Sequence, residues 1–111
     1  MRNFYTVVLE RMKSRSEDFN TEPYETGWAS EAMFFIRVHE FSGGAVRLDA
    51  RVQVSVDGIT WIDEGTRFPS LDKAGDYFIK VGHFGGWLRL CNTLSGDSPG
   101  IKVTEWLVLK E

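Results

Sequence analysis

Few side chains in this sequence combine a reactive type with a spacing that catalysis or metal binding requires. His39 and Glu40 are adjacent and would suit a metal pair or an acid–base dyad, but they fall in a stretch with the pattern of a strand. Neighbouring side chains of a strand point to opposite faces, so these two cannot converge. His83 lies in the glycine-rich run 82–86, which lacks the spacing of a phosphate-binding loop and precedes a predicted strand rather than a helix. A tight turn accounts for this run.

The acidic residues and the single thiol give no catalytic arrangement either. Asp63 or Glu64 could pair with Asp76 as in a glycosidase, but nothing in the sequence sets the separation that such a pair needs across a sugar ring. Cys91 is the only cysteine, which excludes an intrachain disulfide, and no histidine stands in a nucleophile motif with it. No stretch has the ligand spacing of an EF-hand calcium loop. We therefore expect no catalytic residues, no metal, no cofactor and no enzymatic activity.

The tryptophans are the remaining group with chemical potential. Aromatic rings stack on sugars, so Trp28, Trp61 and Trp87 are candidates for a carbohydrate-binding platform. Aromatic residues also fill the interior of β-sandwiches, where tryptophan is usually mostly buried. Packing and ligand binding both stay open as explanations, with packing the simpler one.

Any such site would have to be held by strands, and the clearest strand pattern covers residues 46–56. Apolar and polar side chains alternate there at every position. The apolar side chains share one face: Val46, Leu48, Ala50, Val52, Val54 and Val56. One face of this segment therefore meets a core and the other meets water, which is typical of an antiparallel sheet. The run stops at Asp57-Gly58, a dipeptide that favours a type I′ hairpin turn.

Strand patterns recur along the rest of the chain. They cover residues 3–12, 24–30, 32–41, 59–63, 76–83, 87–94 and 101–110. Residues 42–44 and 95–100 are rich in glycine, serine and proline and predict breaks between strands. No stretch has helical periodicity. The pattern predicts a single all-β domain over residues 1–111, an antiparallel β-sandwich of about eight strands resembling a jelly roll.

Length and charge narrow the function classes. A chain of 111 residues has room for one domain with its own core. Its net charge of −3 argues against nucleic acid, because phosphate binding needs a basic face. The sequence shows no signal-peptide pattern and no apolar run long enough to cross a bilayer. We expect neither nucleic acid nor a membrane as partner, and a location in a virion or the cytoplasm.

The last predicted strand is apolar on both faces. Four apolar residues share its first face: Ile101, Val103, Leu107 and Leu109. Trp106 and Val108 make the second face apolar as well, and Glu105 interrupts the first, which suggests a bulge or a position at the rim. Either loops of the same chain or a neighbouring subunit must cover the second face. We expect the latter, a homo-oligomer with Trp106 and Val108 in its interface.

Several short sequence motifs follow one another along the chain. Tyr24-Glu-Thr-Gly-Trp-Ala-Ser precedes an apolar strand ending Phe41-Ser-Gly-Gly; Val54-Ser-Val-Asp-Gly-Ile-Thr-Trp and Gly86-Trp-Leu-Arg-Leu follow, before a last strand that ends at Lys110. This arrangement, over about residues 24–110, resembles small β-sandwich proteins of tailed-phage and phage-like structural gene clusters, in the head-decoration or head–tail neighbourhood. The resemblance implies a non-enzymatic structural or decoration protein that docks on a larger assembly such as a phage virion, with capsid or other virion proteins as partners. The alternative is a small carbohydrate-binding β-sandwich module.

Overall fold

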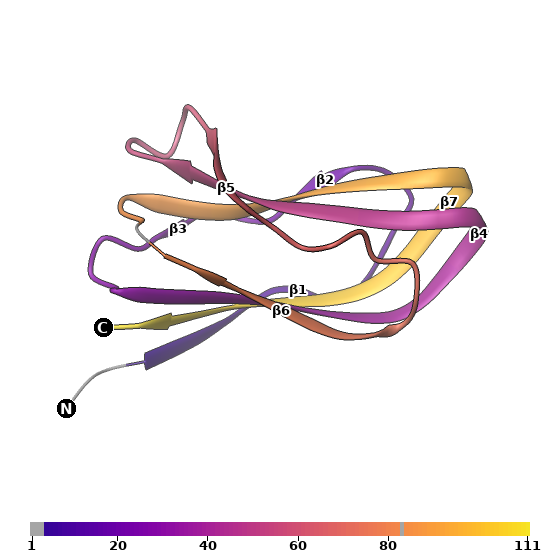
Figure 1. Cartoon of the computed structure of the whole chain (residues 1–111), viewed down its shortest axis with the longest axis horizontal. Helices are drawn as coiled ribbons and strands as arrows, with labels where there is room; N and C mark the ends of the chain where they lie inside the picture. Colours follow the sequence, from indigo (N-terminus) through magenta and orange to yellow (C-terminus); the bar gives the residue numbers. More distant parts are fainter. Residues whose placement is uncertain (1–3, 83) are drawn as a thin grey trace.

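The computed structural model describes residues 4–82 and 84–111, and those residues form seven strands and no helix (Figure 1). The strands are β1 (Phe4–Arg15), β2 (Phe19–Asn20), β3 (Tyr24–Glu25), β4 (Glu31–Ser55), β5 (Ile62–Arg67), β6 (Gly75–Val81) and β7 (Trp87–Lys110). Every pairing between them is antiparallel. The predicted all-β, antiparallel class is confirmed.

Strands β4 and β7 pair with each other along almost their entire length and bend together. Their register runs from Glu31 opposite Lys110 to Ser55 opposite Trp87. The register shifts fall in the middle, between residues 38 and 47 of β4, and both strands turn in this region (Figure 1). A single hydrogen-bonded sheet therefore folds over on itself, and the fold is a sandwich whose two layers share their two central strands.

The breaks predicted at residues 42–44 and 95–100 are wrong, because β4 and β7 continue through these residues and bend there. Gly96 in β7 has φ of 130°, and a Cβ at this position would lie 2.8 Å from the Gly44 carbonyl oxygen of β4. Only glycine tolerates both the backbone angle and the close approach. The predicted strands 32–41 and 46–56 are thus the two halves of β4, and those at 87–94 and 101–110 are the two halves of β7.

Each layer has four positions across its width. The first layer runs in the order β1, the 101–110 half of β7, the 31–41 half of β4, and β6. In the second layer, β2 and β3 share the outer position and pair with the 87–95 half of β7. That half pairs with the 47–55 half of β4, which in turn pairs with β5. The two layers lie one above the other in Figure 1, joined by the bend at the right.

The core lies between the layers and consists of the side chains that alternate inward. The largest fully buried apolar side chains are Phe34, Ile36, Leu48, Val52, Leu71, Leu88, Leu90, Val103 and Leu107. Val46 and Ala50 are buried as well, so the alternation predicted for this strand is confirmed through Val52. Burial of this apolar surface is the main term that stabilises the fold.

The prediction fails at the end of the strand. Val56 was expected on the core face but is 93% exposed, whereas Ser55 is buried. The reason is that β4 ends at Ser55, whose hydroxyl accepts hydrogen bonds from the backbone N–H groups of Asp57 and Gly58. The side chain of Ser55 is therefore used to build the turn, and the alternation does not continue past it.

The predicted type I′ turn at Asp57-Gly58 is wrong. Gly58 has φ of 79°, but Asp57 keeps a negative φ, and a type I′ turn needs positive angles at both positions. The Asp57 carboxylate instead accepts hydrogen bonds from the backbone N–H groups of Ile59 and Thr60, at 2.8 and 3.0 Å. The turn is thus a six-residue loop organised by an aspartate side chain, and β5 begins at Ile62, later than the strand predicted over 59–63.

Smaller differences concern the remaining strands. The strand predicted over 24–30 is reduced to the two residues of β3, while β1 extends to Arg15. In β6 the side chains alternate, with Val81 buried inside and Phe78 exposed outside. His83 lies outside the described residues.

Candidate functional site

The outer face of the first layer carries apolar side chains that line up across all four strands. Val8 of β1 pairs with Trp106 of β7. Trp106 pairs in turn with Phe35 of β4, and Phe35 with Phe78 of β6. The Phe35 and Phe78 rings stack with centroids 5.7 Å apart, and the Arg37 guanidinium lies 5.3 Å from the centre of the Trp106 ring. We call Val8, Trp106, Phe35 and Phe78 the apolar row.

Solvent reaches this row, although the layer beneath it is densely packed. Phe78 is 56% exposed and Val8 is 37% exposed, whereas Phe35 and Trp106 are half-buried by their neighbours. The row is bordered on one side by an ion pair in which Arg37 Nε donates to Asp76 Oδ1 at 2.7 Å. An apolar strip of this width, rimmed by charged groups, has the composition of a protein contact surface.

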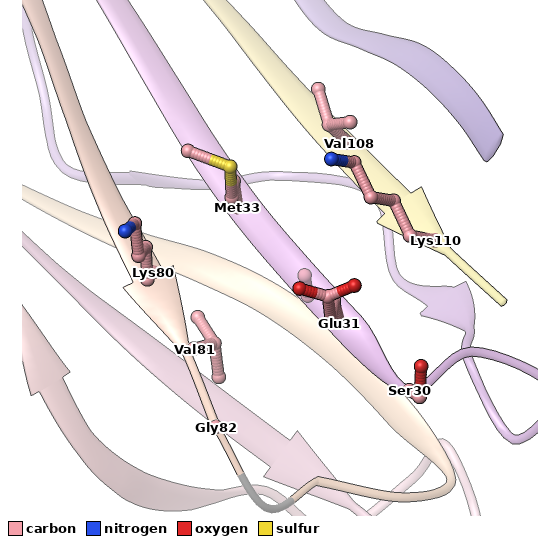
Figure 2. A pocket seen from close by; sticks show the side chains of 9 residues that line it. Ser30, Glu31, Met33, Lys80, Val81, Gly82, Val108 and Lys110 are labelled. Atoms are coloured by element: carbon pink, nitrogen blue, oxygen red, sulfur yellow. The ribbon is translucent and has the colours of Figure 1, made fainter.

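A pocket of about 460 Å³ opens beside the apolar row, at the start of β4 and the end of β7 (Figure 2). Met33 and Val108 pair across the two strands and lie next to the row on the same face. Lys80 of β6 and Lys110 of β7 flank them on either side, and Glu31 lies between the two lysines. We call this the lysine-flanked pocket.

The two residues predicted for an interface lie at this surface. Trp106 belongs to the apolar row and Val108 to the lysine-flanked pocket, and both are half-buried. The expectation that β7 is apolar on both faces is therefore met by its geometry: Leu107 and Leu109 point into the core and the two predicted residues point away from it. Contact with a partner stays a prediction.

The three tryptophans predicted for a ligand platform occupy different surroundings. Trp61 lies in the loop before β5, with the Arg89 guanidinium 4.4 Å from the centre of its ring. Trp87 starts β7 and packs against the backbone of Gly58. A Cβ added at Gly58 would lie 3.2 Å from the Trp87 indole. Among the described residues, no ring contact joins either of them to Trp28.

Trp28 lines a different cleft, of about 590 Å³, at the end of the sandwich away from the bend. Phe4, Tyr5 and Tyr24 also line it, together with the carboxylate-bearing Glu25. Phe4 and Tyr5 are largely exposed and Trp28 is 42% exposed. This aromatic cleft is the place in the described structure where a stacking ligand has room, and it contains one of the three predicted residues.

A polar cluster is buried between the layers, at the edge closed by β1. Glu105 of β7 is fully buried, and its Oε1 accepts a hydrogen bond from Asn92 Nδ2 at 3.2 Å. Glu10 of β1 lies opposite Glu105 in the register, and Arg15 donates to the Glu10 carboxylate at 2.7 Å. Glu105 Oε2 and Asn92 Oδ1 have no hydrogen-bond partner among the described residues.

Burial decides the charge of Glu105. The pKa of its carboxyl is raised from 4.5 to about 8, chiefly by removal from water. The Asn92 hydrogen bond opposes this rise, and the nearby Glu10 charge adds to it. The group is therefore mostly protonated at neutral pH. The expected rim position of Glu105 is wrong, and the expected bulge lies in the neighbouring strand: β1 carries an extra residue on each side of Glu10. The break in apolar parity at Glu105 was the sequence signal for this cluster, but nothing in the sequence linked it to Asn92.

The described residues give no sign of a metal centre. Within residues 4–82 and 84–111, no group of three or more histidine, cysteine, aspartate or glutamate side chains is placed to hold an ion. His39 uses its Nε2 in a hydrogen-bond contact of 2.8 Å with the Thr104 hydroxyl, and Cys91 is half-buried. Over the same residues, no helix has the length and apolar character needed to cross a membrane.

Comparison with known proteins identifies neighbours in structure and none in sequence. No family model matches the chain, and no curated protein matches it. Its fold is similar to that of the SPBc2 prophage-derived protein YomS, with a TM-score of 0.56 and 11% identity over 100% of this chain and 96% of that one.

Two further neighbours come from infectious bursal disease virus. A chain of its T13 viral particle gives a TM-score of 0.58 at 11% identity, and a chain of the Gx strain gives 0.53 at 12%. Each alignment covers 98% of this chain but only 31% and 32% of those chains. At such identities the likeness shows the fold alone, a sandwich found in a prophage protein and in viral particles.

Proposed function

We propose that this protein is a non-enzymatic structural component that docks on a larger assembly, such as a phage virion, through the apolar row and the lysine-flanked pocket. The observation that supports this most is the register that aligns Val8, Trp106, Phe35 and Phe78 across the whole first layer. The inward side chains of the same strands already fill the core. The row is therefore not needed to fill the core, and its exposed parts are available for contact.

The chemistry of the row suits protein contact. Tryptophan and phenylalanine bury large areas with few rotatable bonds, and such residues dominate binding energy when they lie at the centre of an interface. The charged rim, formed by the Arg37–Asp76 ion pair on one side and by Lys80 and Lys110 on the other, would set the orientation of a partner. The neighbours in a prophage and in viral particles are compatible with this role.

Self-association is the first form of docking to test. We expect light scattering over a concentration series to report a mass above the 12.7 kDa of one chain. Trp106→Ser should lower that mass, because it removes the central ring of the row. Trp28→Ser is the matched control, since it removes an exposed tryptophan that belongs neither to the apolar row nor to the lysine-flanked pocket. A strict monomer at every concentration, unchanged by Trp106→Ser, would contradict self-association.

A carbohydrate-binding module remains the second candidate, and the aromatic cleft around Trp28 is the observation that favours it. Titration of glycans should then quench or shift tryptophan fluorescence, and Trp28→Ala should abolish the response while Trp61→Ala leaves it intact. Stacking on one ring is worth about 1–3 kcal/mol, by analogy with bases stacked on aromatic side chains. No response to a broad glycan panel would remove this candidate.

A further inference from the structure

The loop between β4 and β5 exposes aliphatic side chains at the end of the molecule. Val56, Ile59 and Ile62 are 93%, 80% and 64% exposed, although each is large and apolar. The loop projects beyond the body of the sandwich at the upper left of Figure 1. We call residues 56–62 the apolar tip. Three exposed aliphatic residues within seven positions concentrate apolar exposure in one loop.

The apolar tip is held in one shape by polar contacts at its base. The Asp57 carboxylate accepts hydrogen bonds from the backbone of Ile59 and Thr60 and from the Ser55 hydroxyl. At the start of β5, Asp63 accepts from Arg51 Nε at 3.0 Å and from Gln53 at 3.1 Å. A loop that is ordered before it meets a partner loses little conformational entropy on binding.

Charge makes the apolar tip complementary to the lysine-flanked pocket. Backbone hydrogen bonds lower the pKa of Asp57, which keeps it ionised, and no cation of the described residues forms an ion pair with it. Lys80 and Lys110 are exposed beside the apolar floor of Met33 and Val108, and neither has an ion-pair partner in the described part of the chain. One surface thus offers aliphatic groups with a negative charge. The other offers an apolar floor flanked by Lys80 and Lys110, with the Glu31 carboxylate between them, so that positive charge is in excess there.

We propose that the apolar tip of one copy of this chain docks into the lysine-flanked pocket of the next copy. This inference rests on the proposed function, which makes the outer face of the first layer a docking surface, and it names the occupant. The two surfaces belong to different layers, so the contact joins different patches of the two copies. Such a contact is either reciprocated in a two-fold dimer, with each tip in the partner's pocket, or repeated head-to-tail into a closed ring or an open filament.

Two sets of variants separate the two sides of this contact. The tip variant carries Val56→Ser and Ile59→Ser, and the pocket variant carries Lys80→Glu and Lys110→Glu. Thr60→Ser in the loop and Lys73→Glu, an exposed lysine between β5 and β6, are the matched controls. Circular dichroism and the thermal midpoint verify that each chain folds. Light scattering should show wild-type mass for the controls and the 12.7 kDa monomer for each variant alone.

Mixing the two variants is the decisive measurement. The tip variant keeps its pocket and the pocket variant keeps its tip, so an equimolar mixture should form a 1:1 complex of twice the chain mass and nothing larger. A mixture that stays monomeric overturns the proposal. So does a tip variant that assembles like wild type while Trp106→Ser does not, an outcome that would leave the outer face as the docking surface in a face-to-face dimer. A wild-type chain that is monomeric throughout overturns this contact and self-association together.

Discussion

At the scale of single residues, the feature with the largest physical consequence is the buried carboxyl of Glu105. It occupies an inward position of β7, and the next inward residues on either side, Val103 and Leu107, are apolar. Its Oε2 atom lacks a hydrogen-bond partner among the described residues. A buried charge at this place would be costly, so the fold keeps the proton. The cluster therefore ties folding to proton uptake.

The stability of the protein should fall as pH rises from about 4.5 to about 8. The pKa of Glu105 is 4.5 when the chain is unfolded and about 8 when it is folded, so the folded state binds more protons between these limits. The free energy of unfolding should lose up to roughly 1.4 kcal/mol per pH unit from this group in that window. Glu105→Gln should flatten the dependence, as measured by urea denaturation at several pH values. Glu22→Gln, at an exposed position, should not, and equal slopes for both variants would contradict the burial argument.

Gly58 is the second residue with a sharp expectation. Its φ of 79° is unfavourable for a side chain, and an added Cβ would contact the Trp87 indole at 3.2 Å. Gly58→Val should lower the free energy of unfolding by roughly 1 kcal/mol or more. An unchanged midpoint of denaturation would show that the loop adopts another conformation in solution.

At the scale of the elements, the bend shared by β4 and β7 determines the architecture. Gly96→Ala should destabilise the protein by about 1–3 kcal/mol, because the added methyl group would meet the Gly44 carbonyl at 2.8 Å in a backbone region that favours glycine. Gly85→Ala is the matched control, since an added Cβ there has open space. Chemical denaturation of both variants tests this, and equal losses would show that the bend does not depend on glycine.

The same bend marks the limit of what the sequence predicts. Alternation places most of 46–56 on the correct face, because period-two patterning follows directly from strand geometry. Glycine-rich runs were interpreted as breaks, since local composition cannot distinguish a turn from a bend inside a continuous ladder. The pairing that joins Trp106 with Val8 and Phe35, and the contact between Glu105 and Asn92, depend on register between distant strands. Those features needed the structure.

At the scale of the whole molecule, the topology delays the first stabilising contacts. The pair formed by Glu31 and Lys110 closes a loop of most of the chain, and each half of β4 needs its partner half of β7 before either layer is complete. Proteins dominated by such distant pairings fold slowly. We expect stopped-flow refolding in the range of milliseconds to seconds, and a microsecond phase that accounts for the full amplitude would contradict this.

The continuity of β4 and β7 through both layers also restricts how the molecule can deform. Two separate sheets can slide over each other, but covalent and hydrogen-bonded backbone joins these layers along one side. The bend therefore holds the two layers together on that side. The layers can separate only at the end away from the bend, where the strands carry residues of the Trp28 cleft and of the lysine-flanked pocket. We therefore expect any separation of the two layers to begin at that end and not at the bend.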